Sequence, residues 1–265
     1  MQRTILFLFA VLSLTSFNAY AAAQARSGAR SGKANRTEDR VIIQRRRIVL
    51  IRSPELTRQF PERKSAVVSY PVISGLNDAV VLHRVRSALA FKKIFDYSLK
   101  EYREDPWLSE FSYVVNYNSN YLLDITFMQS GMAAYPDDQT KHFLINLKDG
   151  STVKVSDTFE ANELETLAVM IDHKLQHEIK QIEDENAAST DSQAKKWSKE
   201  AHENLKFEVQ NLDDFSVGRT GITFLYDAGF PHAIKAFEPR GKYFFTYSEL
   251  KPYIKRDGPL GQFVQ

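Results

Sequence analysis

Two histidines on one predicted helix have the spacing of a metal site. His173 and His177 lie four positions apart in an apolar-periodic run from Ala161 to about Asp184, and histidines at i and i+4 of a helix can share one metal ion. The zinc-protease pattern needs Glu after the first histidine, where this chain has Lys174. At 100° per residue, both histidines fall opposite the apolar stripe. We therefore expect them to be solvent-exposed, and we predict neither metal ligands nor a cofactor.

Acidic side chains form two clusters that could bind a cation or act as acid and base. Asp137 and Asp138 lie in a predicted turn, and residues 183–185 close a predicted helix. Neither cluster has the Asp-x-Asp-x-Asp-Gly spacing of a calcium loop, so we interpret both as solvated turn and helix-end residues. Carboxylates such as Asp124, Asp137 and Asp138 could still serve a hydrolase if the fold brought two of them together.

The chain lacks the sequence patterns that mark common catalytic sites. A Gly-x-Ser-x-Gly elbow, a phosphate-binding loop and a dinucleotide fingerprint are all absent from the sequence. There is no cysteine, which excludes thiolate metal ligands, a cysteine nucleophile and disulfides. We therefore predict no catalytic residue. The alternatives are a hydrolase or deacetylase-accessory domain acting on envelope polysaccharide, and a structural role without a small ligand.

Aromatic residues at predicted turns are the best candidates for contacts with a partner. Tyr117 and Tyr121 flank an Asn-rich turn, and Tyr135 lies in a second turn beside two aspartates. An aromatic side chain at such a position can anchor a protein or a glycan. The predicted binding residues are Tyr117, Tyr121, Tyr135, Asp137 and Asp138.

The first residues are typical of a secretory signal peptide. Arg3 gives a positive start, Ile5 to Leu14 is almost unbroken apolar sequence, and Ala19 to Ala21 provides small residues for a cleavage site. The apolar run has ten residues, fewer than the roughly 20 that a membrane-spanning helix needs. We predict that residues 1–21 are removed near Ala21, with cleavage one or two residues later as the alternative. The mature protein is then secreted or periplasmic.

Charge divides the mature chain into a basic arm and an acidic body. Residues 22–64 hold twelve Lys or Arg against four Asp or Glu, whereas residues 65–265 hold 22 against 29, a net charge of −7. A basic arm is attracted to anionic envelope surfaces, although a solvated tether is the simpler interpretation. No nucleic-acid motif and no later apolar span is present, so we predict neither a nucleic-acid partner nor a transmembrane segment.

The apolar periodicity predicts an α+β fold, an antiparallel strand meander packed with long helices. Its two halves, residues 65–155 and 156–265, are expected to form one compact body. Pro71 interrupts the first β-rich run, which suits an edge strand. The expected helices are 76–103, 161–184, a polar one toward 211, and 248–254; the expected strands are 65–73, 111–116, 121–128, 141–147, 152–155, 214–217, 222–226 and 243–246.

An ordered set of short runs between about Tyr70 and Pro259 resembles a known family. The runs are Phe111 to Asn118, Tyr121 to Ile125, Ala134 to Pro136, Phe143 to Ser151, Ser156 to Phe159, Gly221 to Phe224, and Tyr247 to Tyr253. In order and spacing they resemble the uncharacterised domain of the ectodomain of RsiV, the bacterial anti-sigma-V factor, which also stands beside the deacetylase domain of PdaC.

The resemblance implies an α+β domain with a strand-rich front half and a helix-plus-strand back half. In the anti-sigma factor this domain is a receptor for lysozyme; beside the deacetylase it is not known as the catalyst. The present sequence has no sigma-binding region and no deacetylase domain, and no catalytic residue carries over. The resemblance and the signal peptide together favour an exported, envelope-associated binding protein. Its ligand is expected to be a cell-wall glycan or a wall-acting protein such as lysozyme, whose positive charge suits an acidic body.

Overall fold

The computed structural model describes residues 39–133, 135–187 and 192–265. The predicted signal peptide at residues 1–21 and the first part of the predicted basic arm lie outside these ranges. Among the described residues, no helix combines the length and the apolar character that crossing a membrane requires.

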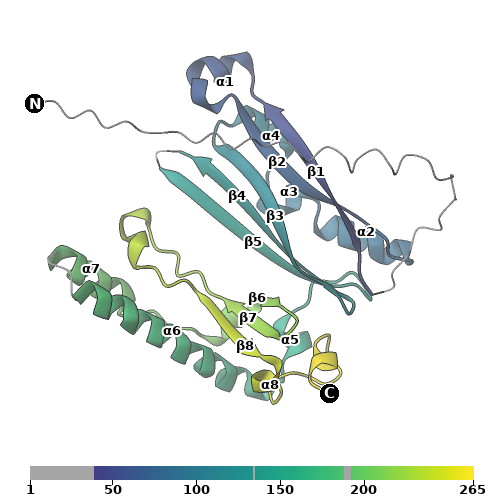
Figure 1. Cartoon of the computed structure of the whole chain (residues 1–265), viewed down its shortest axis with the longest axis vertical. Coiled ribbons are helices and arrows are strands. Elements are labelled where there is room, and N and C mark those ends of the chain that lie inside the picture. The colour runs from purple at the N-terminus through teal and green to yellow at the C-terminus, as the bar shows by residue number, and fades with distance from the viewer. Residues whose placement is uncertain (1–38, 134, 188–191) are drawn as a thin grey trace, which may run out of the picture. The chain divides into compact units, whose positions relative to one another are not determined.

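A five-stranded mixed sheet, which we call the front sheet, is formed by the first half of the described chain (Figure 1). Its strands lie side by side in chain order: β1 (Ile42–Ile51), β2 (Ser65–Ser74), β3 (Leu108–Ser119), β4 (Leu122–Met132) and β5 (Pro136–Asn146). Neighbouring strands are antiparallel except β2 and β3, which run parallel. Strand β1 comes from the segment predicted as a basic arm, and its three consecutive arginines are exposed.

Pro71 was expected to place its strand at a sheet edge, but β2 lies second in the sheet. The parallel pairing with β3 covers only Val67 and Val68, whereas Pro71 lies opposite Arg45 of β1. Within the described part of the chain, one side of β2 is therefore unpaired at Pro71, which is the condition under which a strand tolerates the missing N–H of proline.

The helical region expected between residues 76 and 103 consists of three helices. These are α2 (Ala79–Ala88), α3 (Phe91–Phe95) and α4 (Leu99–Glu104), and the shorter α1 (Pro54–Gln59) joins β1 to β2. The prediction of one long helix is wrong because Asp96 adopts a left-handed conformation with φ 61° and ends α3. Ser98 then caps α4 through a capping box with Glu101, a signal that starts a new helix.

The back of the fold is a three-stranded antiparallel sheet beside two helices. Its strands are β6 (Phe215–Val217), β7 (Gly221–Leu225) and β8 (Lys242–Thr246), in that order. The helices are α6 (Leu164–Ala187) and α7 (Ser192–His202), and Figure 1 shows α6 alongside this sheet. The remaining elements are short: α5 (Val155–Thr158), α8 (Tyr247–Leu250), and 3₁₀ turns at Pro61–Arg63, Ala161–Glu163, Val209–Asp213, His232–Phe237 and Gly261–Phe263. Together with the front sheet they confirm the predicted α+β class.

The apolar stripe of α6 packs into the core of the back sheet. Its buried residues are Leu167, Ala168, Ile171, Leu175 and Ile179, as the helical periodicity predicted. They belong to a cluster that includes strand residues of both sheets, among them Leu122 and Leu144 of the front sheet. A second cluster lies between the front sheet and helices α2 to α4.

Asp124 of β4 connects the two sheets through hydrogen bonds. Its fully buried carboxylate accepts hydrogen bonds from Asn116 Nδ2 at 2.6 Å, from His142 Nε2 at 2.8 Å and from the main-chain N–H of Val217 in β6 at 2.6 Å. His142 Nδ1 lies 3.2 Å from an oxygen of Asp214, just before β6. Burial lowers the pKa of His142, but its hydrogen bonds and the negative charges of the two aspartates outweigh this effect and raise the pKa to about 9. The imidazolium is thus held between two carboxylates.

Candidate functional site

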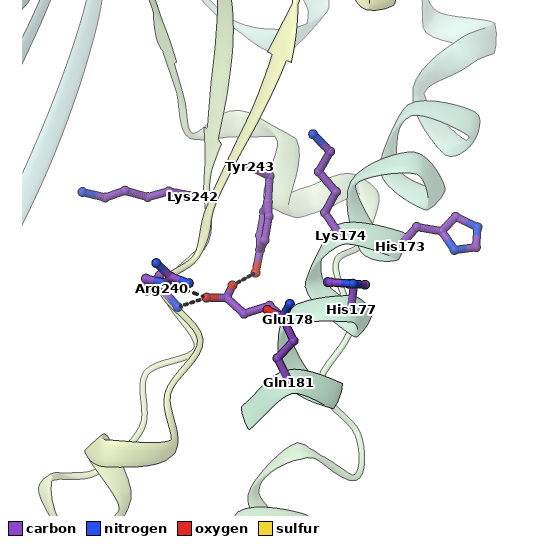
Figure 2. A pocket seen from close by; sticks show the side chains of 8 residues that line it. All are labelled: His173, Lys174, His177, Glu178, Gln181, Arg240, Lys242 and Tyr243. Atoms are coloured by element: carbon purple, nitrogen blue, oxygen red, sulfur yellow. Dashed lines mark hydrogen bonds and ion pairs between the residues drawn. The ribbon is translucent and has the colours of Figure 1, made fainter. Parts of the chain in front are cut away.

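A surface groove of about 730 Å³ lies between α6 and β8 (Figure 2). Eight residues line it: His173, Lys174, His177, Glu178 and Gln181 from α6, then Arg240, Lys242 and Tyr243 from β8 and the residues before it. We call this hollow the α6–β8 groove. Its volume falls within the range of small-molecule sites.

Helical geometry explains why four of the five lining residues of α6 reach the groove. Lys174, His177, Glu178 and Gln181 recur at i, i+3, i+4 and i+7, which places them on one strip of the helix. The neighbouring positions Leu175 and Ile179 are buried and hold this strip against the edge of the back sheet. The groove is therefore fixed by the same packing that buries the apolar stripe.

A glycine allows the opposite wall to turn into β8. Gly241 has φ 62°, and a Cβ there would meet the carbonyl oxygen of Tyr226 at 1.8 Å. Only glycine fits this left-handed, closely packed position. The turn places Arg240 and Tyr243 on either side of it within reach of α6.

Glu178 is the polar centre of the groove. Its side chain is only 14% exposed, and its oxygens accept hydrogen bonds from the Arg240 main-chain N–H at 2.9 Å, from Arg240 Nε at 3.3 Å and from the Tyr243 hydroxyl at 3.1 Å. Figure 2 shows these contacts converging on one carboxylate. The side chain of Arg240 remains 87% exposed, so its guanidinium can contact a ligand while its Nε is bound.

Tyr243 stays protonated at physiological pH. Burial raises the pKa of its hydroxyl, and the neighbouring carboxylate of Glu178 raises this pKa further. The hydroxyl therefore acts as a hydrogen-bond donor to Glu178 and is not a candidate base.

Lys174 provides a second cation on the helix side. Its Nζ donates to the main-chain oxygen of Phe244 at 2.5 Å and lies 3.9 Å from the centroid of the Phe245 ring. A cation–π contact of this kind holds an ammonium group in place without neutralising it.

His173 and His177 are both exposed, as the helical periodicity predicted. Figure 2 shows the His173 ring pointing away from Glu178. In the described ranges, no group of three or more His, Asp or Glu side chains could hold a metal ion.

The groove has more positive than negative side chains. Lys174 and Arg240 stand against the single carboxylate of Glu178, which is already engaged with Arg240, whereas the side chain of Lys242 extends away from Glu178 (Figure 2). The groove therefore suits an anionic ligand, because charged hydrogen bonds from Arg and Lys to a carboxylate are strong and directional.

Two of the predicted binding residues lie at the turn between β3 and β4. Tyr117 is buried in the core, and its hydroxyl accepts a hydrogen bond from Asn120 Nδ2 at 2.6 Å. Tyr121 is half-buried beneath the Lys148 ammonium group, at 5.3 Å from its ring centroid. Tyr121 also lines a smaller hollow of about 150 Å³ together with Lys148 and Asp257.

The other three predicted residues lie at the opposite end of β4. Tyr135 is 62% exposed and stacks on His232 with ring centroids 4.6 Å apart. Asp137 and Asp138 are exposed on β5, so the prediction that they lie in a turn is wrong: both pair with β4. Because β4 has eleven residues, the two turns lie on the order of 30 Å apart. The fold thus does not bring the five residues into one site.

The carboxylates considered for a hydrolase also lie apart. Asp124 is opposite Leu144 in the β4–β5 pairing, and Asp138 is opposite Ser130, six positions further along β4. Six residues of strand span about 20 Å, well beyond the separation of a glycosidase carboxylate pair. Asp124 is also fully buried.

Sequence patterns did not predict the polar residues that define the groove, Lys174, Glu178, Arg240 and Tyr243. Glu178 carried a weak signal, because a carboxylate directly beside the apolar stripe needs a partner. Its partners lie more than sixty positions away in the chain, and no local pattern connects them.

The fold is similar to two solved structures. One is a DUF3298 family protein from Bacteroides fragilis, with 12% identity, a TM-score of 0.54, and coverage of 87% of this chain and 99% of the other. The second is a DUF3298 family protein from Pseudomonas aeruginosa, with 12% identity, a TM-score of 0.50, and coverage of 84% and 97%. DUF3298 is an uncharacterised domain family. No family model and no curated protein matches the sequence.

Proposed function

We propose that this protein is an exported, envelope-associated binding protein and not a catalyst. We further propose that its α6–β8 groove binds a carboxylate-bearing fragment of the cell-wall polymer peptidoglycan. The observation that carries the proposal is the excess of positive charge around Glu178. Arg240 is oriented by Glu178 but remains exposed, so a ligand carboxylate can bind it without first breaking a buried contact.

Export and wall binding are supported by other features of the chain. The first 21 residues have the order of a signal peptide, which would bring the groove to the cell wall. The resemblance to the domain of the anti-sigma-V factor and of the deacetylase adds an envelope setting. The similarity to DUF3298 structures supports the fold alone.

The test is a calorimetric titration of the mature protein with a soluble muropeptide, a wall disaccharide that carries its short peptide. We expect measurable binding that weakens as salt rises, because charge attracts the ligand. Arg240→Ala and Lys174→Ala are each expected to weaken binding by roughly 10-fold, which corresponds to one charged hydrogen bond.

Lys180→Ala is the matched control. Lys180 lies on the same helix and is exposed, but it pairs with Asp184 and does not line the groove. Equal losses in Lys180→Ala and Arg240→Ala would mean that net charge, and not the groove, determines binding. The absence of a heat change with the muropeptide would overturn the proposal.

A cationic wall-acting protein such as lysozyme is the second candidate partner. It is favoured by the exposed Tyr135 beside the exposed Asp137 and Asp138, since an aromatic anchor with acidic neighbours suits a positively charged surface. In a titration with lysozyme, the double variant Asp137→Asn and Asp138→Asn is expected to slow association while leaving muropeptide binding unchanged. Unaltered lysozyme binding by this variant would exclude the Tyr135 region as the contact.

A further inference from the structure

The free edge of β8 forms one wall of the α6–β8 groove. Among the residues that the structure describes, strand β8 is the last strand of its sheet and pairs only with β7. The Gly241 carbonyl accepts from Tyr226, and the Tyr247 N–H donates to Thr220, so these two residues face the β7 side. Because peptide groups alternate along a strand, the main-chain groups of Lys242 and Phe244 face the opposite side, toward α6.

Helix α6 already uses part of this edge. The Arg240 N–H donates to Glu178, and the Phe244 carbonyl accepts from Lys174. Within the described ranges, the N–H and C=O of Lys242 and the N–H of Phe244 have no hydrogen-bond partner. An unpaired strand edge of this kind can pair with an extended peptide.

Lys242 contributes its main chain to the groove. Figure 2 shows its side chain extending away from Glu178 and α6, although the residue lines the hollow. The side chain and the peptide group of Lys242 thus face different surroundings, and substitutions can test them separately.

We propose that the groove recognises the peptide portion of its ligand: a short extended peptide pairs its amide groups with the free N–H and C=O of Lys242, and its carboxylates lie against Arg240 and Lys174. This inference rests on the proposed function, because it names the part of the wall fragment that the same groove holds. A residue whose N–H and C=O both point to the same side presents the pattern that one strand offers to another.

The lining of the groove favours a peptide over a sugar. The one tyrosine among the lining residues is Tyr243, which is buried and therefore offers no open ring face for a sugar. The main-chain edge and the exposed Arg240 instead match an amide next to a carboxylate.

Three probes separate this inference from the proposed function: the intact muropeptide, the same disaccharide without its peptide, and the free peptide. If the inference is right, the free peptide binds within ~10-fold of the muropeptide and the disaccharide does not bind measurably. Binding of the muropeptide and the disaccharide with equal affinity would overturn the inference and leave the proposed function standing. A muropeptide that does not bind would overturn both.

The substitution Lys242→Pro tests the role of the main chain. Proline removes the N–H that faces the groove, and it leaves the ladder to β7 intact because the Lys242 N–H does not belong to that ladder. We expect peptide affinity to fall by ~10-fold, as for one lost hydrogen bond. Lys242→Ala is the matched control and should change the affinity by less than ~2-fold, since its side chain points away from the groove. Equal losses in the two variants would overturn the inference.

A second measurement covers the case in which Lys242→Pro does not fold. Free peptides N-methylated at one amide at a time are titrated against the unaltered protein. Loss of affinity on methylation of one particular amide supports pairing with the Lys242 carbonyl. Equal affinity across the whole methylated series would overturn the inference.

Discussion

Asp124 and Glu178 are both carboxylates with three hydrogen-bond donors, but their surroundings differ. Asp124 is fully buried between the two sheets, and its donors come from three elements that cannot move independently. Glu178 lies at the surface of the groove, and its partner Arg240 is exposed to solvent. Asp124 therefore fixes the fold, whereas Glu178 orients groups that remain free to bind a ligand.

The number of hydrogen-bond donors alone therefore does not identify a functional carboxylate. Water and ligands cannot reach Asp124, so its contacts contribute to stability. The contacts of Glu178 lie next to open space, so they can be rearranged when a ligand binds. Variants of Asp124 and His142 test the buried contacts, and variants of Glu178 and Lys180 test the exposed ones.

Removal of the buried carboxylate is expected to have the largest effect. Asp124→Ala leaves the Val217 N–H without its partner and the His142 ring with Asp214 alone, and breaking such a buried pair costs about 3–5 kcal/mol of unfolding free energy. Urea unfolding measures this loss. Asp137→Ala, on the exposed part of β5, is the matched control and should change stability by less than about 0.5 kcal/mol. Comparable losses in the two variants would show that Asp124 does not hold the sheets together.

The second expected effect is a loss of stability at alkaline pH. The pKa of His142 is raised to about 9 in the folded protein from an ordinary 6.5, so the folded state holds the proton more tightly. The resulting stabilisation is complete below pH 6.5 and is lost as pH rises through 9, by about 3 kcal/mol at most. Urea unfolding from pH 6 to pH 10 measures it.

His142→Gln is the control for the pH effect. The variant lacks the titrating ring, so its unfolding free energy should be flat through the same pH window. If the variant lost stability between pH 6.5 and 9 as steeply as the unaltered protein, another group would be responsible for the effect.

A smaller effect on stability, but a change in binding, is expected for Glu178→Gln. The amide can still accept from Tyr243, so the unfolding free energy should fall by only about 1 kcal/mol. Arg240 loses its anionic partner, and the groove gains one net positive charge. Because a carboxylate binds more strongly to positively charged groups, the affinity for the muropeptide should rise by roughly a few-fold. Calorimetry measures the affinity. Weaker binding would mean that Glu178 itself contacts the ligand.

The smallest effect is expected for Lys180→Ala. Lys180 and Asp184 form an exposed i,i+4 pair at 2.9 Å on α6, and solvent screens such pairs. We expect no measurable change in the urea midpoint or in muropeptide affinity. A clear loss of stability would mean that the surface of α6 contributes more to the fold than its buried stripe suggests.

Local patterns predicted the elements of this fold better than its site. The stripe of α6 and the strands near residues 215, 222 and 243 follow from the periodicity of apolar residues. The single helix expected over residues 76–103 failed because the left-handed Asp96 and the Ser98 capping box interrupt the pattern. The candidate binding residues Tyr117 and Tyr135 share a type and a turn setting, yet one is buried in the core and the other is exposed.

A charged residue in a largely apolar strand indicates a buried polar contact. Asp124 interrupts the run from Tyr121 to Met128, and a lone carboxylate in a buried strand must have partners. The sequence could not say that these partners were His142 and the main chain of Val217, because the second lies 93 positions away.

Local sequence patterns were sufficient to predict most of the strands, helix α6 with its buried face, and the candidate export signal. These properties depend on residue type and on spacing within a few positions. The tertiary structure was needed to show that Asp124 is part of the core while Glu178 lines a groove. It was also needed to show that this groove includes the free edge of β8. The physical reason is that both sites join residues far apart in the chain, and the packing of whole elements sets those distances.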